Sequence, residues 1–395
     1  MSRRIFAPGN RWLVGYLTFL SAFAPLSTDM YLPALPRMAG SLHTSYADIS
    51  LTVSGFLLVF AASMLFWGPL SDKYGRRPVL LAGSLLYIVA SVSIALAQSF
   101  AALLFWRGVQ ALGSGALGAM AMAVVKDVLR GPQMERVLAW MQTVMIIAPM
   151  LAPVVGSWLL LLTDWRGIFW TLTLCGAVAL TGTLALRETA RQRTQGGVSA
   201  VLQRIPVVLG KREFSRPLLL FSAMSMPFMA YLGISAHVVQ THFGQTAQAF
   251  GLFFAANALC SMFGPILHMR LFRHWPRRRV IACHLAGMSL GGALLLVCGG
   301  LSVWCFAACY AAITFCGSAL RPPATVLMME SIRGDNGVVA SLINSGGLLF
   351  GSLSMFLATL PFWSTAIVAA GVISCLVPGV AWCAWQRLGR EYCGE

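Results

Sequence analysis

The chain has 395 residues, of which 58% are hydrophobic and only 10% charged, and its mean hydropathy is +0.77. A water-soluble protein cannot expose that much apolar surface, so the composition excludes an ordinary soluble domain. At about 20 apolar residues per membrane span, the length allows roughly twelve spans and leaves little mass for anything else.

Long apolar runs follow one another along the chain, each bounded by charged or turn-forming residues. The runs are continuous rather than alternating, which is typical of spanning helices and not of barrel strands. We therefore predict an all-α, polytopic membrane protein with twelve transmembrane helices. The predicted spans are 12–34, 47–67, 79–98, 100–124, 137–161, 166–186, 217–240, 247–269, 280–299, 301–327, 338–359 and 363–386.

A polar interruption with seven basic residues and a Gly-Gly pair separates the first six spans from the last six, as expected of a linker. We predict an N-terminal six-helix bundle at 1–186, a cytoplasmic linker at 187–216 and a C-terminal six-helix bundle at 217–395. Parallel repeats of this kind, with a substrate site at their interface, are typical of secondary transporters.

The two halves echo each other weakly, which supports two six-helix pseudo-repeats. In the second half, a Gly-Pro pair is followed by a basic cluster, and an acid ends a later span, as in the first half. The matching segments are Gly264-Pro-Ile-Leu267 with Gly68-Pro-Leu-Ser71, Arg277-Arg-Arg-Val280 with Arg76-Arg-Pro-Val79, and Glu330 with Asp127.

The formal charge of +16 prompts a nucleic-acid hypothesis, but the positions of the charges argue against it. With the N-terminus inside, 24 of the 28 Lys and Arg fall on one side of the predicted membrane, while Arg37 and Arg166 fall outside. This positive-inside pattern predicts that both termini are cytoplasmic. The inside residues are Arg3, Arg4, Arg11, Lys73, Arg76, Arg77, Lys126, Arg130, Arg136, the seven between Arg187 and Arg216, the five between Arg270 and Arg279, Arg333, Arg387 and Arg390.

The segment Gly68-Pro-Leu-Ser-Asp-Lys-Tyr-Gly-Arg-Arg-Pro78 is expected to form a short cytoplasmic loop between the second and third spans. It resembles the loop signature of the major facilitator superfamily. The resemblance implies a charge-relay cluster that holds the cytoplasmic side shut; the alternative is a solvated loop that only sets topology. The gate residues so implied are Gly68, Asp72, Gly75, Arg76, Arg77 and Asp127.

Two charged residues lie inside predicted spans in the first half, where an ionisable group is costly and usually functional. Asp29 lies about five residues before the outer end of the first span, and Arg107 about seven residues inside the fourth. At 1.5 Å per residue both are expected at matching depth, some 8–12 Å below the outer interface. They form either a structural ion pair or a proton-coupling site, in which the proton affinity of Asp29 responds to desolvation and to the guanidinium.

Five further segments resemble the Bcr/CflA branch of drug/proton antiporters, whose members export bicyclomycin, chloramphenicol and similar drugs in exchange for protons. The resemblance implies that Asp29 couples protons and that Arg107 begins the branch's Arg-Gly-x-Gln signature. The segments are Thr28-Asp-Met-Tyr-Leu-Pro-Ala-Leu-Pro36, Arg107-Gly-Val-Gln110, Ala152-Pro-Val-Val-Gly156, Trp165-Arg-Gly-Ile-Phe-Trp170 and Phe250-Gly-Leu-Phe-Phe-Ala-Ala-Asn257.

The chain also departs from related multidrug antiporters. Some relatives carry a second acid earlier in the first helix, where this chain has Ser21 and uncharged neighbours, so neutral or zwitterionic substrates are expected rather than bulky cations. In the fifth span, Ala152 and Ser157 stand where the signature usually has glycine. Small residues still permit close helix packing.

Candidate cavity residues are Tyr31, Gln110, His237 and Asn257; for the last two the alternative is a packing role. Arg321 precedes Pro322-Pro323, where the tenth helix is expected to break or kink. Its side chain either contacts substrate or snorkels to the cytoplasm.

The ten cysteines lie mostly in apolar runs and form no C-x-x-C pair, so no disulfide framework is implied. Cys305 and Cys309 share a helix face, where a thiolate metal site competes with simple packing. We expect no metal and no cofactor.

These features together predict a proton-driven multidrug exporter of a bacterial inner membrane that works by alternating access. The chain has no ATP-binding signature, so the energy is expected to come from an ion gradient. Its expected partners are small-molecule drugs, protons and the lipid bilayer, with no nucleic acid, and it is expected to be a monomer. The nearest alternative is a proton-coupled exporter or importer of a natural metabolite such as a sugar or siderophore. A membrane enzyme would need clustered acids and histidines, and a channel would not need two rocking halves.

Overall fold

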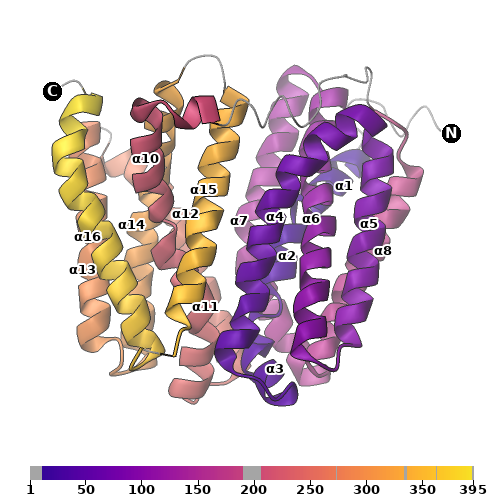
Figure 1. The fold of residues 1–395 in the computed structure, drawn as a ribbon, viewed down its shortest axis with the longest axis horizontal. Helices are drawn as coiled ribbons and strands as arrows, with labels where there is room; N and C mark the ends of the chain where they lie inside the picture. Colours follow the sequence, from indigo (N-terminus) through magenta and orange to yellow (C-terminus); the bar gives the residue numbers. More distant parts are fainter. Residues whose placement is uncertain (1–10, 190–205, 273, 333–335, 362, 394–395) are drawn as a thin grey trace. The chain divides into compact units, whose positions relative to one another are not determined.

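The computed structural model describes residues 11–189, 206–272, 274–332, 336–361 and 363–393, and this part of the chain is helical without strands. It divides into two compact units, Met1–Thr44 with Leu51–Val201 and Ser45–Ser50 with Leu202–Glu395 (Figure 1). The division falls inside the predicted linker. Residues 190–205 of that linker, and the basic residues Arg3, Arg4 and Arg333, lie outside the described residues.

The first unit contains the helices up to α8, although the first residues of α4 are grouped with the second unit. The helices are α1 (Arg11–Ser21), α2 (Phe23–Asp29), the 3₁₀ turn η1 (Leu32–Ala34), α3 (Leu35–Ser41), α4 (Tyr46–Tyr74), α5 (Arg76–Ala95), α6 (Phe100–Val128), α7 (Gly131–Leu162) and α8 (Trp165–Ala185).

The second unit begins its long helices inside the predicted linker, because α10 starts at Arg212. Its helices are α10 (Arg212–Ala223), α11 (Met226–His237), the π-helical turn η2 (Val238–His242), α12 (Ala247–Leu271), α13 (Arg277–Cys298), α14 (Val303–Glu330), α15 (Asn336–Ala358) and α16 (Ala366–Cys393).

Among the described residues, eleven helical segments are long and apolar enough to cross a membrane, and the first predicted span holds a shorter apolar helix. That span is broken into α1, α2 and η1. Helices α1, α2 and α10 end at Ser21, Asp29 and Ala223, each four residues before a proline. The reason is that proline lacks an N–H and its ring collides with the carbonyl four residues earlier.

The same rule does not hold at Pro322-Pro323, nor at the interior prolines of α4, α7, α12 and α16. Helix α14 continues through both prolines to Glu330, so the break expected there is wrong. In a helical bundle, neighbouring helices and local adjustment can compensate for the lost hydrogen bonds, and prolines are therefore tolerated inside spanning helices.

Many large apolar side chains are exposed on the helices. Leu162 is 82%, Val297 81% and Trp304 72% exposed. Such surfaces are unfavourable in water and suited to lipid. Together with the eleven spanning segments, they identify a multi-pass membrane protein.

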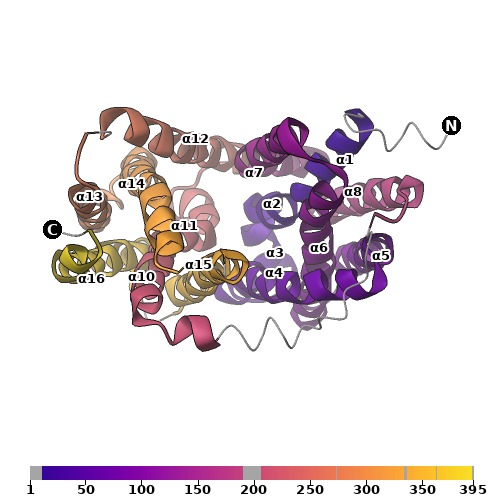
Figure 2. The same ribbon diagram turned by 90° about the horizontal axis from the view of Figure 1, so that it is seen from above.

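Helix contacts follow the same order in both units. In the first unit, α5 packs on α6 and α8; in the second, α13 packs on α14 and α16 (Figure 2). Counting spans, the third helix of each set contacts the fourth and the sixth. This correspondence supports the predicted pseudo-repeats.

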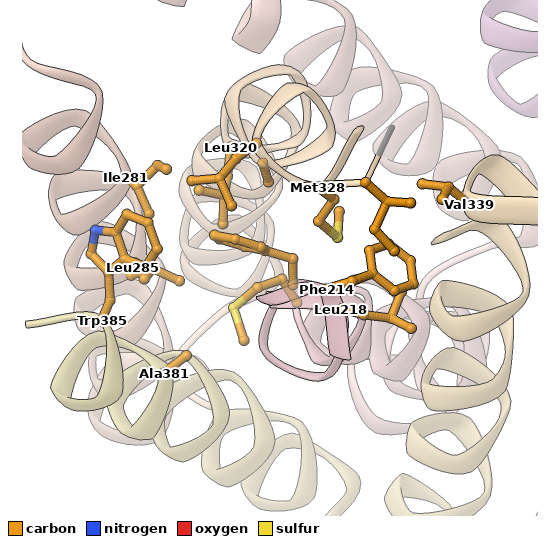
Figure 3. Packing of buried hydrophobic residues seen from close by; sticks show 14 of the residues in the cluster. Phe214, Leu218, Ile281, Leu285, Leu320, Met328, Val339, Ala381 and Trp385 are labelled. Carbon is orange, nitrogen blue, oxygen red and sulfur yellow. The ribbon is translucent and has the colours of Figure 1, made fainter. Parts of the chain in front are cut away.

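A cluster of buried apolar residues holds the second unit together. Figure 3 shows Phe214 and Leu218 of α10 on the same side as Met328 of α14 and Val339 of α15, while Ile281 and Leu285 of α13 lie beside Trp385 of α16. The Trp385 ring is buried, and its Nε1 donates to the carbonyl oxygen of Arg278 at 3.0 Å. The cluster joins elements that are far apart in the sequence.

Candidate functional site

Arg107 is the centre of a buried polar network in the first unit. It lies in α6, which begins after the N-cap Ser99, and its side chain is 0% exposed. Its Nη1 donates to the carbonyl oxygen of Ser27 at 3.0 Å and to Oε1 of Gln110 at 2.6 Å, and its Nη2 donates to the Tyr31 hydroxyl at 3.2 Å. The guanidinium therefore joins α6 to α2 and to the turn after it.

Two aromatic rings cover the same guanidinium. Its Cζ lies 4.4 Å from the ring centroid of Tyr31 and 4.3 Å from that of Phe56 in α4. The negative faces of aromatic rings attract a cation, and this attraction is stronger where water is excluded. Oxygen dipoles and ring faces thus surround the buried charge of Arg107.

A second set of hydrogen bonds holds the partners of Arg107. The Gln110 amide donates to Ser91 of α5 at 2.8 Å, and the Tyr31 hydroxyl lies 2.9 Å from Thr52 Oγ1 of α4. The Tyr87 hydroxyl lies 2.7 Å from Ser27 Oγ. Tyr31 and Gln110, predicted as cavity residues, are therefore fully buried parts of the network.

Asp29 is the last residue of α2 and is only 5% exposed. Arg107 contacts Ser27 and Tyr31 on either side of it, so the predicted match in depth is present. The structure shows no ion pair between Asp29 and Arg107, which are both described residues. Arg107 instead contacts the backbone carbonyl of Ser27 and the hydroxyl of Tyr31.

The break after Asp29 packs closely against α7. A Cβ atom at Gly156 would lie 1.7 Å from the carbonyl oxygen of Met30, which no real side chain could tolerate. Helix α2 also contacts both α6 and α7. Gly156, part of the fifth-span motif, is therefore needed for backbone to approach backbone at this break.

The expected cytoplasmic loop is almost entirely helical, which corrects its predicted extent. Helix α4 continues to Tyr74 and α5 begins at Arg76, so only Gly75 separates them. Gly75 has a φ of 105°, a conformation that favours glycine, and its N–H donates to the Ser71 carbonyl at 2.9 Å. By contrast, a Cβ at Gly68 would meet nothing within 4 Å.

Arg76 is the centre of the expected charge cluster. Its Nε lies 2.9 Å from Oδ2 of Asp127 at the end of α6, and its Nη1 pairs with Asp72 and donates to Ser71. The side chains of Arg76 and Asp127 are 13% and 20% exposed. The contact between Arg76 and Asp127 is thus confirmed, while its gating role stays a prediction.

Glu188 is a member of this cluster that the sequence reasoning missed. Its carboxylate accepts from the backbone N–H of Arg76 at 2.8 Å and of Arg77 at 3.2 Å. These are free N–H groups at the start of α5, where a negative charge is favoured. Arg77 in turn donates to the Leu184 carbonyl at 3.1 Å. The signal available in the sequence was that Glu188 is an acid directly after the sixth span, within the predicted linker.

The second unit carries a matching ion pair. Nη1 of Arg277, at the start of α13, lies 2.7 Å from Oε2 of Glu330, at the end of α14. This is the equivalent of the contact between Arg76 and Asp127. The side chains are more exposed here, at 41% and 60%. The weak sequence echo between the halves therefore corresponds to a shared structural contact.

The two predicted cavity residues of the second unit lie in different settings. His237 is half-buried, and its ring centroid is 4.6 Å from that of Tyr46, beside a small cavity of about 160 Å³. Asn257 is buried in α12, and its Oδ1 has no hydrogen-bond partner. Arg321 is exposed in α14.

A histidine pair in the second unit was also not predicted. Nδ1 of His268 in α12 lies 3.0 Å from Nε2 of His284 in α13, and the Phe272 ring packs against both. His284 is 4% exposed. Residues 16 apart on different helices gave no sequence signal for this contact. In the described part of the chain, no group of three or more His, Cys, Asp or Glu could hold a metal ion.

The protein has spanning helices in two units with matching contacts, and the first unit holds buried charged side chains. These features define a membrane transporter rather than an enzyme. The chain belongs to the major facilitator superfamily, since the profile of that family matches residues 17–344. Its assignment to the Bcr/CflA branch stays a prediction.

Comparison with known proteins gives further relatives. The multidrug resistance protein MdtL of Escherichia coli O81 (strain ED1a) is 39% identical to the chain over 166 residues, which is 42% of this chain and 42% of that protein. The peptide transporter POT in complex with sulfate has a TM-score of 0.74 at 15% identity, with all of both chains covered. The xylose transporter XylE from E. coli has a TM-score of 0.71 at 11% identity, over 95% of this chain and 97% of that one. At these identities the two structures show the fold alone.

Proposed function

We propose that the chain is a proton-driven multidrug exporter, a drug/proton antiporter that exposes its binding site alternately to the two sides of a bacterial inner membrane. The observation that carries the proposal is Asp29, the only buried carboxylate among the described residues, at the end of a broken helix beside the Arg107 network. The similarity to a relative named as a multidrug resistance protein supports drugs as the substrates.

In this proposal Asp29 binds and releases the transported proton. An ionised carboxylate is costly in a site without water, whereas a protonated one costs much less. The ionised form of Asp29 therefore favours a conformation in which water reaches the site, and the protonated form favours one that excludes water. Asp29 belongs to the turn between Ser27, held by Arg107, and the Met30 carbonyl, which abuts Gly156. A movement driven at Asp29 would reach both α6 and α7 through these contacts.

The proposed role of Arg107 is to position this turn rather than to pair with the proton carrier. Its hydrogen bonds to Ser27 and Tyr31 hold the two ends of the break. Tyr31 and Gln110 act with it as positioning residues, because their polar atoms are engaged in the network. His237 and Asn257 remain the proposed substrate contacts in the second unit, for neutral or zwitterionic compounds.

The proposed cytoplasmic latch is the cluster of Asp72, Arg76, Asp127 and Glu188. It joins the ends of α4, α5 and α6 to the segment after α8. With both termini in the cytoplasm, the basic residues of this cluster lie on the inner side, as the positive-inside pattern requires.

Reconstituted vesicles test the proposal. A pH gradient should drive accumulation of a neutral drug such as chloramphenicol, and a protonophore should abolish it. The Asp29→Asn variant should lose gradient-driven transport and keep drug exchange without a gradient. Asp164→Asn is the matched control, because Asp164 is an exposed N-cap and asparagine caps equally well.

Three results would count against parts of this proposal. Accumulation that is insensitive to the protonophore would exclude proton antiport. Normal gradient-driven transport by Asp29→Asn would remove Asp29 as the coupling site. Transport of a sugar or siderophore, with no drug transported, would favour the metabolite alternative.

A further inference from the structure

Three cysteines gather where α13 and α14 meet at one end of the second unit. Cys298 is the last residue of α13, and α14 begins at Val303 after the N-cap Ser302. The Sγ atoms of Cys298 and Cys309 lie 3.7 Å apart. Cys305 lies four residues before Cys309, on the same face of α14. The hairpin thus brings two thiols into direct contact across adjacent helices.

One of the two thiols, that of Cys298, can be reached by an oxidant. Cys298 is half-buried at a helix end, and its thiol donates to the Leu294 carbonyl at 3.0 Å. Cys309 is 8% exposed and lies behind it. A disulfide needs a sulfur–sulfur distance of about 2.05 Å, so the two sulfurs must approach by less than about 2 Å. Rotation of the Cys298 side chain at the end of its helix is a short movement of this kind.

The position of the pair also determines its redox environment, under the orientation given with the proposed function. The basic cluster from Arg277 to Arg279 begins α13, and Cys298 ends this helix of 22 residues. At 1.5 Å per residue the helix is about 33 Å long, enough to cross the bilayer. If the basic end faces the cytoplasm, Cys298 and Cys309 lie at the outer side, where disulfides form and persist.

We propose that Cys298 and Cys309 form a disulfide that ties α13 to α14. The oxidant is a disulfide-bearing thiol oxidase or a small-molecule disulfide. The Cys298 thiolate attacks one sulfur of that disulfide, forming a mixed disulfide and releasing one thiol. The Cys309 thiolate then attacks Cys298 Sγ and releases the second thiol. Two cysteine thiols are oxidised, the oxidant disulfide is reduced to two thiols, and the protons balance.

The bond would close a ring of twelve residues from Cys298 to Cys309, around the short connection between the helices. Its consequence is local, because the two helices already pack along their length. It would prevent their outer ends from separating and so keep the hairpin intact during movements of the protein. Cys305, half-buried and one turn away, is the third thiol and the alternative partner.

Counting thiols tests the proposal directly. Cells are quenched with trichloroacetic acid, which protonates the thiols and stops disulfide exchange, and the full-length protein is denatured, purified and labelled with a mass-tagged maleimide before and after reduction. The chain has ten cysteines, so eight are expected to be free before reduction. Ten free thiols without reductant would overturn the proposal. Chymotrypsin cleaves after Trp304 and Phe306, so a joined peptide that separates on reduction identifies the bond in the unaltered protein.

Variants identify the partners. Cys298→Ala and Cys309→Ala should each show nine free thiols with or without reductant. Cys305→Ala should show seven before reduction and nine after, as should Cys383→Ala, an exposed control. Loss of the reducible pair in Cys305→Ala would assign the bond to Cys305 and overturn the proposed pairing. The thiol count does not depend on transport, so it separates this proposal from the proposed function.

Discussion

The ion pair between Arg76 and Asp127 can be tested by a double-mutant cycle with Arg76→Gln, Asp127→Asn and the double variant. The two singles remove one charge each and keep a polar side chain of similar size. The coupling free energy between the residues is the part of the double variant's loss that the two single losses do not explain. The backbone N–H of residue 76 keeps its bond to Glu188 in every variant, because that bond does not use the side chain.

The structure sets the expected magnitude. At 2.9 Å and an effective dielectric constant of about 20, Coulomb's law gives a gross attraction of about 6 kcal/mol. The desolvation of both groups and the ordering of a long side chain oppose it. Asp72 also pairs with Arg76 and offsets part of the loss. For side chains 13% and 20% exposed, we expect a coupling of about 2 kcal/mol.

The assay is equilibrium unfolding of the purified protein in mixed micelles with increasing SDS, followed by tryptophan fluorescence. The pair formed by Arg277 and Glu330 is the control, because it is also a close arginine–carboxylate pair, at 2.7 Å, but its side chains are 41% and 60% exposed. Its coupling should be too small to resolve, since exposed pairs are screened by water. Equal couplings in the two cycles would refute the argument that burial makes the first pair strong.

Three further substitutions can be measured in the same titration. Gly156→Ala should destabilise the protein by about 1–3 kcal/mol, because its Cβ would collide with a backbone carbonyl. Gly108→Ala is the control, since its Cβ would meet nothing within 4 Å and the substitution should be neutral or stabilising. Equal effects of the two substitutions would contradict the packing explanation. Glu188→Gln should cost about 0.5–1 kcal/mol at low ionic strength, and a loss that persists in 1 M salt would contradict a charge effect at the start of α5. His268→Ala should cost about 1–2 kcal/mol by leaving a buried nitrogen of His284 unpaired, with His268→Gln recovering part of it; no loss would mean that water replaces the partner.

The fold followed from patterns that are local in the sequence. Apolar runs long enough to cross a bilayer gave the spans, and their agreement with the helical segments reflects the cost of leaving backbone groups unpaired in lipid. Local chemistry also explains the ends of α1, α2 and α10, each four residues before a proline. It fails at Pro322-Pro323, where α14 continues because the effect of a proline depends on its surroundings.

The candidate site was only partly predictable. Asp29 and Arg107 were visible in the sequence as rare charged residues in apolar runs. Their equal depth in the membrane followed from the rise per residue of a helix. Their lack of an ion pair could not be foreseen, because it depends on how α2 is rotated toward α6. The partners that Arg107 does have are carbonyl oxygens, side chains and ring faces on α2, α4 and α6.

By itself, the sequence determined that this is a multi-pass helical transporter and where its spans lie. It also singled out Asp29, Arg107 and Arg76 as charged residues in or next to apolar spans. These properties depend on composition and on spacing along one helix. Only the tertiary structure decided that Glu188 caps α5, that His268 contacts His284 and that Cys298 contacts Cys309. Each of these contacts joins different elements, and their meeting depends on how helices pack and rotate against one another.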